Sequence, residues 1–148
     1  MHLAAMSEIV PLMCEQLAAG GTVRFSPRGV SMLPMLREGL DSVELSPVPD
    51  RLQRFDIPLY RRRSGEYVLH RVVAEGETYT CMGDNQYVPE TGLAHEQMIA
   101  VVTAFYRKNK RCSMSGLGYR VYCYVWHYSR NLRHFLGRCI RFLKRRLS

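Results

Sequence analysis

The 148 residues suffice for one domain with a core, and contents of 47% apolar and 23% charged residues indicate a globular chain and exclude a disordered one. No apolar run approaches the roughly 18 residues of a membrane-spanning helix, and residues 1–20 lack the basic-then-apolar order of a signal peptide. The net charge of +8 is divided unevenly, because residues 1–106 hold nine Arg and thirteen acids, whereas residues 107–148 hold twelve cations and no acid.

Residues 1–106 are predicted to form a mainly β domain behind one N-terminal helix. Apolar residues recur at helical spacing over 3–19, with Pro11 as a kink and Gly20-Gly21 as the stop. Short strands separated by Gly, Pro and charged turns follow, at 22–25, 42–45, 56–60, 67–74, 77–82 and 97–106. This spacing predicts a coiled or barrel-like antiparallel sheet.

The C-terminal part is predicted to be a polar linker, 107–118, followed by a basic amphipathic helix over 119–148. One hypothesis is that this helix lies on an anionic membrane surface, with its aromatic side chains in the interface. The alternative is that it packs on the β domain with its basic face in water. Nucleic acid is a third polyanion, but no nucleic-acid-binding motif supports it.

The cysteine count bears on location and cofactors. Five cysteines are an odd number, and none forms a CxxC pair. We therefore expect reduced thiols, no zinc site and no cofactor. A reducing compartment predicts a cytoplasmic protein, peripheral at the inner face of the membrane if the tail binds lipid.

The turn after the first strand contains a candidate nucleophile, Ser31. It lies between Gly29, which lets the backbone turn sharply, and Pro34, which ends strand character. A serine at such a junction can expose its Oγ and direct nearby backbone N–H groups at one point. The same residues also make ordinary turns, so a catalytic role requires a base.

His70 is the best-placed candidate base. No lysine precedes Lys108, His2 is terminal, and His95 lies in a polar loop. Alternation along 67–74 places His70 between two valines on an apolar face, where burial would keep its imidazole neutral near pH 7. The alternative is a core histidine satisfied by one hydrogen bond.

The loop that begins at Gly83 offers two carboxylates, Asp84 and Glu90. Either could orient the imidazole of His70 through its second ring nitrogen. Gly83-Asp84-Asn85 is also a good tight-turn sequence in its own right.

Taken in order, four segments resemble the signal peptidase I family, which is related to the self-cleaving repressor proteases. The resemblance covers about residues 20–106. Its segments are Gly29-Val30-Ser31-Met32-Leu33-Pro34, Asp56-Ile57, Tyr67-Val68-Leu69-His70-Arg71-Val72-Val73 and Gly83-Asp84-Asn85.

The resemblance implies that fold, with Ser31 as nucleophile and His70 as base where bacterial members usually have lysine. It implies that Asp84 belongs to the supporting acids and that Glu90 stands where histidine-type members carry a second aspartate. Gly29 replaces a hydroxyl residue, so the backbone N–H groups of Val30 and Ser31 would form the oxyanion hole.

The expected function is therefore that of a serine endopeptidase acting on a peptide or protein substrate. The substrate would lie extended along a strand edge, which presents a scissile bond in fixed register. The alternatives are a non-catalytic peptide-binding module that retains the fold and a self-cleaving relative of the repressor proteases.

Overall fold

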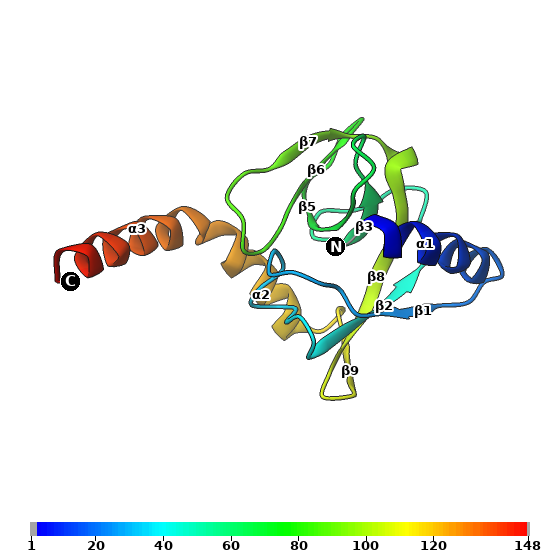
Figure 1. Ribbon diagram of the computed structural model, residues 1–148, viewed down its shortest axis with the longest axis horizontal. Coiled ribbons are helices and arrows are strands. Elements are labelled where there is room, and N and C mark those ends of the chain that lie inside the picture. Colours follow the sequence, from blue (N-terminus) through cyan, green and yellow to red (C-terminus); the bar gives the residue numbers. More distant parts are fainter. Residues whose placement is uncertain (1–2, 148) are drawn as a thin grey trace.

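A computed structural model describes residues 3–147, and His2 lies outside the described residues (Figure 1). Its helices are α1 (Leu3–Ala18), α2 (Leu117–Tyr128) and α3 (Arg130–Leu147), with a short 3₁₀ turn at His95–Gln97. Its strands are β1 (Val23–Phe25), β2 (Asp41–Ser46), β3 (Pro58–Arg61), β4 (Tyr67–Leu69), β5 (Arg71–Ala74), β6 (Tyr79–Met82), β7 (Glu90–Leu93), β8 (Met98–Arg107) and β9 (Lys110–Ser113).

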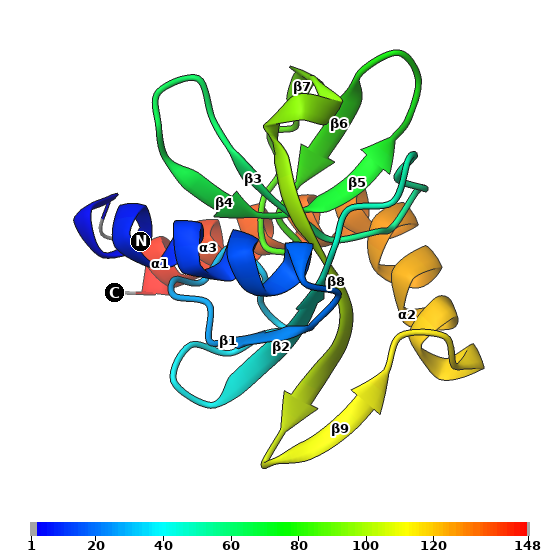
Figure 2. The same ribbon diagram turned by 90° about the vertical axis from the view of Figure 1, so that its right-hand side faces the viewer.

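The strands form two antiparallel sheets (Figure 2). The larger sheet has the order β1-β2-β8-β3-β4, with β9 also paired to β8, and the smaller has the order β5-β6-β7. Helices and strands occupy comparable shares of the chain, and the sheets do not close into a barrel. The prediction of antiparallel sheets with flanking helices is confirmed. The prediction of a mainly β, barrel-like domain overstated the share of strands and the closure of the sheets.

The predicted strand 67–74 is divided between the two sheets. β4 pairs with β3 in the larger sheet, and β5 pairs with β6 in the smaller one. His70 occupies the break between them, and both it and its neighbours Leu69 and Arg71 are buried. The burial predicted for His70 is therefore found, and the residues on both sides of it are buried as well because the chain passes between two packed sheets.

Residues 107–118 are not a linker, which corrects the predicted domain boundaries. β8 runs on to Arg107, and β9 pairs back on it in the register Arg107↔Lys110. Lys108 and Asn109 form the connection with φ values of 49° and 62°. Two consecutive positive φ values are characteristic of the type I′ turn, whose backbone twist matches the right-handed twist of the two strands that it joins.

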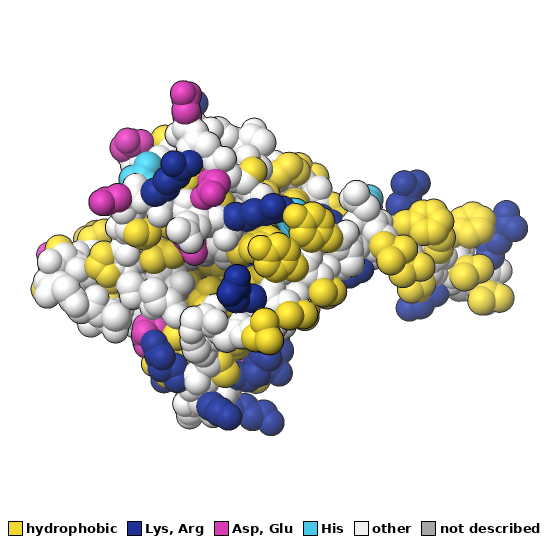
Figure 3. All heavy atoms as spheres, turned by 180° about the vertical axis from the view of Figure 1, so that it is seen from behind, with side chains coloured by type: hydrophobic (Ala, Val, Ile, Leu, Met, Phe, Trp, Pro, Cys, Tyr) yellow, Lys and Arg dark blue, Asp and Glu magenta, His cyan; other side chains and the backbone are white. Residues whose placement is uncertain are grey.

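The basic tail consists of two helices rather than one, with Ser129 between them. α2 packs against the body of the molecule, whereas α3 extends away from it (Figures 1 and 3). Within residues 3–147, no helix combines the length and apolar character needed to cross a bilayer.

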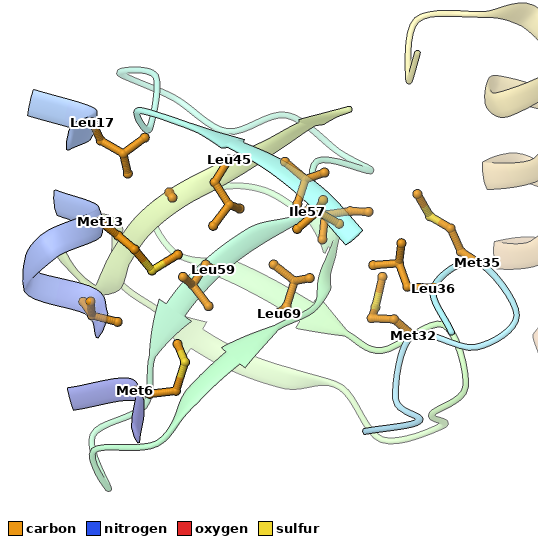
Figure 4. Packing of buried hydrophobic residues seen from close by; sticks show 14 residues of the cluster. Met6, Met13, Leu17, Met32, Met35, Leu36, Leu45, Ile57, Leu59 and Leu69 are labelled. Carbon is orange, nitrogen blue, oxygen red and sulfur yellow. The ribbon is translucent and has the colours of Figure 1, made fainter. Parts of the chain in front are cut away.

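The main core extends from α1 across the larger sheet to Met32, Met35 and Leu36 (Figure 4). Met6, Val10, Met13 and Leu17 recur at helical spacing on the buried face of α1 and pack in one cluster with sheet residues such as Leu45. Each such side chain contributes roughly 1.5–3 kcal/mol on burial. The predicted helix over 3–19 is thus found, and it continues through Pro11.

Candidate active site

The Ser31 turn is held from behind by the loop that begins at Gly83. The backbone N–H of Asn85 donates a 2.8 Å hydrogen bond to the carbonyl oxygen of Ser31, and Asn85 Nδ2 donates one of 3.1 Å to the Val30 carbonyl. A Cβ on Gly83 would lie 2.5 Å from the Ser31 carbonyl oxygen, so only glycine permits this approach. The two segments of the resemblance are therefore one structural unit.

Two candidate oxyanion donors remain available at this turn. Within residues 3–147, the backbone N–H groups of Val30 and Ser31 donate no hydrogen bond. Both residues line a pocket of about 480 Å³, and Val30 is exposed. Unpaired N–H groups beside a serine are the arrangement that can stabilise a developing oxyanion.

His70 lines the same pocket as Ser31. Its Nδ1 lies 3.2 Å from the Tyr60 hydroxyl and 3.4 Å from Glu90 Oε1. Its Nε2 has no hydrogen-bond partner in the described part of the chain, and no hydrogen bond links the ring to Ser31 Oγ. Burial lowers the pKa of His70 to about 4, with Glu90 opposing this shift and Arg62 adding to it. The imidazole is therefore neutral at pH 7.

Glu90 is the carboxylate beside His70, and Arg62 fixes its position. Arg62 Nε donates to Glu90 Oε2 at 2.9 Å, and Arg62 Nη2 also bonds to Oε1. Burial alone would raise the pKa of Glu90, but Arg62 and His70 outweigh it and hold the pKa below its ordinary value. Burial and Glu90 raise the pKa of the Tyr60 hydroxyl, so Tyr60 stays protonated.

Asp84 makes no hydrogen bond or ion pair with His70 within residues 3–147, so of the two candidate carboxylates only Glu90 contacts the ring. Arg71 Nε and Nη2 bind Asp84 Oδ1 and Oδ2, each at 2.8 Å, and both side chains are buried. Successive residues of an extended segment point in opposite directions, so His70 faces the pocket and Arg71 reaches the other way to Asp84. Asp84 therefore anchors the loop that holds Ser31.

The first tail helix closes over the Arg71–Asp84 ion pair. The Tyr122 hydroxyl donates to Asp84 Oδ2 at 2.8 Å, and Trp126 Nε1 donates to the Asp84 carbonyl at 2.8 Å. Arg71 Nη1 also lies 2.6 Å from the Tyr119 hydroxyl. For α2, packing on the domain is thus the alternative that the structure bears out, and α2 supports the loop behind Ser31.

β4 forms one wall of the pocket. It is the last strand of the larger sheet, and residues 66–70 all line the pocket. The pocket is also lined by Asn85, Gln86 and the nearly buried Met32 and Leu36, and the apolar lining residue with a large exposed area is Val30. The pocket thus combines an unpaired strand edge, a serine and a neutral histidine.

Sequence reasoning missed Tyr60 and Arg62. Tyr60 ends the strand predicted over 56–60, and Arg62 lies in the charged turn that follows it. The antiparallel register Tyr60↔Val68 brings both residues close to His70. The one signal in the sequence was Tyr60 itself, because a tyrosine hydroxyl that is buried in a strand needs a hydrogen-bond partner.

Comparisons of the chain with family models, curated proteins and solved structures found no match.

Proposed function

We propose that this protein is a serine endopeptidase with Ser31 as nucleophile and His70 as general base. The observation that carries the proposal is the shared pocket: Ser31 and His70 line one cavity beside a free strand edge. The order of the segments that resemble the signal peptidase I family agrees with these roles. The hydrogen bond between serine and base often tightens only when substrate binds.

The proposed reaction is an acyl transfer to Ser31. Its Oγ attacks the scissile carbonyl while His70 Nε2 takes the hydroxyl proton, and the same proton then passes to the leaving amine. Water repeats the sequence to release the acyl group. The N–H groups of Val30 and Ser31 stabilise the oxyanion of each tetrahedral intermediate.

Glu90 and Tyr60 determine which nitrogen of His70 acts. With the ring proton on Nδ1, facing Glu90 Oε1 at 3.4 Å and the Tyr60 hydroxyl at 3.2 Å, the lone pair is on Nε2. The Glu90 carboxylate also stabilises the imidazolium that forms during attack. Glu90 is therefore the orienting acid of the proposed mechanism, and Arg62 positions it.

The proposed substrate is a peptide bound in extended conformation. The free edge of β4 offers unpaired backbone groups to a peptide strand, and the exposed apolar side chain of Val30 in the same pocket can contact a substrate side chain. Pairing with β4 would carry the scissile bond past Ser31 in fixed register.

A non-catalytic peptide-binding module is the second candidate. It is favoured by the missing hydrogen bond between Ser31 Oγ and His70. In that case the β4 edge and the pocket would bind a peptide without cleaving it.

Covalent labelling separates the two functions without knowledge of the natural substrate. The protein is treated with a fluorophosphonate, which reacts with activated serines, and the label is located by peptide mapping. We expect labelling at Ser31, and cleavage of members of a random peptide library detected by mass spectrometry. Peptide binding with neither labelling nor cleavage would support the binding module instead. The matched control is Ser115→Ala, which removes an exposed serine and should still be labelled at Ser31 and cleave the same peptides.

The pH dependence of cleavage tests the state of His70. Because its pKa is lowered to about 4, the neutral base persists well below pH 6.5, and kcat/KM should fall only as the pH approaches about 4. Glu90 raises this pKa, so Glu90→Gln should move the acid limb to still lower pH while reducing kcat. Circular dichroism over the same range would exclude unfolding as the cause. An acid limb near 6.5 would mean that the base is an ordinary, solvated histidine.

A further inference from the structure

α3 carries two opposed faces. Leu132, Leu136, Ile140, Leu143 and Leu147 recur at intervals of three and four residues, and Phe135 extends the same face. Arg138, Arg141, Lys144 and Arg145 share the opposite face at the same helical spacing. The helix therefore has an apolar side and a cationic side over most of its length, and near its end Arg146 covers the ring of Phe142 on the apolar side.

The apolar face of α3 is uncovered. The helix projects from the body, and Figure 3 shows apolar side chains gathered on it among lysines and arginines. Phe135 is 63% exposed and Leu147 is 88% exposed. Contacts with the body lie at its start, where His134 stacks on Tyr87 at 4.4 Å and Arg133 covers the Trp126 ring. An exposed apolar face of this size indicates a binding surface.

Charge identifies the occupant. α3 itself holds seven Lys or Arg and no acid, so two copies of this helix would repel each other and could form no interhelical ion pairs. A nucleic acid would neutralise the cations but leave the apolar face in water. An anionic bilayer satisfies both faces, because acyl chains cover the apolar side and headgroup phosphates meet the cations.

We propose that α3 is an interfacial helix that docks the protein on an anionic membrane surface. The helix lies in the plane of the interface, with its leucines and Phe135 toward the acyl chains. α2 takes no part in insertion through its inner face, because Tyr119, Tyr122 and Trp126 are bound to the body. Docking of α3 does not depend on the proposed peptidase activity.

Vesicle co-sedimentation with the full chain tests the proposal. Phosphatidylcholine vesicles with and without phosphatidylglycerol are compared at low and high salt. We expect binding to the anionic vesicles, little binding to the neutral ones, and weakening at high salt because exposed charges are screened. Absence of binding to anionic vesicles would overturn the proposal.

A charge variant tests the cationic face. We expect vesicle affinity to fall on the order of a hundredfold, since each cation near an anionic surface contributes about 1 kcal/mol. A matched variant that removes three exposed cations from the body should change affinity by less than about threefold by the same reasoning. Equal losses in the two would overturn the proposal. The variant is Arg138→Gln/Arg141→Gln/Arg145→Gln, and its control is Arg51→Gln/Arg63→Gln/Lys108→Gln.

An apolar variant at constant charge distinguishes lipid from the other occupants. Leu136→Ser/Leu143→Ser should reduce vesicle affinity by at least about tenfold, because buried leucines supply much of the binding. Leu12→Ser/Leu40→Ser, at exposed positions of the body, is the control and should leave it unchanged. An unchanged thermal midpoint would show that each variant still folds.

Two outcomes would assign α3 to another occupant and overturn the proposal. The first is tighter binding to a short DNA duplex than to anionic vesicles, with no loss on Leu136→Ser/Leu143→Ser. The second is a dimer in analytical ultracentrifugation that this substitution dissociates, together with no vesicle binding.

Discussion

Ser31→Ala and His70→Gln are each expected to reduce kcat by about a thousandfold or more, with the double variant no worse than either single one. The nucleophile and its base act in one step, so removing the second has no further effect once the first is lost. Cleavage of a peptide found in the library screen, followed by mass spectrometry, gives the three rates. His95→Gln, a histidine outside the pocket, is the matched control and should retain activity.

Multiplicative losses in the double variant would contradict the proposed pair, because they would place Ser31 and His70 in independent steps. Cleavage that survives Ser31→Ala would mean that the nucleophile is another residue. The thermal midpoint of each variant must be measured alongside, since His70 is buried and bonds to Tyr60 through Nδ1. A folded but inactive protein gives the clearest support.

Long periodic or alternating segments were predictable from the sequence. α1 follows from a helical repeat of apolar residues with a double-glycine stop, and β8 from a long apolar run. β9 was not predictable, because its type I′ turn is made by Lys108-Asn109 rather than by a glycine-containing pair. The break at His70 was hidden for a similar reason, since neither glycine nor proline marks it.

The candidate site was only partly predictable. The motif order led to Ser31 and His70, and the structure brings both to one pocket. The choice between Asp84 and Glu90 was beyond the sequence, because it depends on which way Arg71 points and on the pairing of β3 with β4. Amphipathic periodicity likewise indicated a basic helical tail, but it did not show that α2 packs against the body of the molecule while α3 extends away from it.

The Arg71–Asp84 ion pair joins β5, the loop behind Ser31 and α2. Of the substitutions considered, its disruption should have the largest effect on the free energy of unfolding. Burial disfavours the charged guanidinium, but Asp84 outweighs this and raises the pKa of Arg71 above its ordinary value. Asp84→Asn keeps the shape of the side chain and leaves Arg71 buried without a counter-charge. Breaking a buried pair in this way costs about 3–5 kcal/mol in free energy of unfolding.

Urea denaturation measures this loss of stability. Two further variants show how much of it would follow from removing any carboxylate or from losing one hydrogen bond. Asp50→Asn removes an exposed carboxylate and should change the free energy of unfolding by less than about 0.5 kcal/mol. Tyr122→Phe removes only the hydrogen bond to Asp84 Oδ2 and should cost about 1 kcal/mol.

A double substitution completes the argument, because it removes the stranded charge as well. Arg71→Met combined with Asp84→Asn should recover part of the stability lost in Asp84→Asn alone, since the cost arises from an unpaired buried cation. Independent, additive losses would show that the two side chains are not energetically coupled. Asp84→Asn should also lower kcat, because the loop that Asp84 anchors holds the Ser31 carbonyl through Asn85. An Asp84→Asn protein as stable as Asp50→Asn would mean that α2 and the loop are held by their apolar contacts instead.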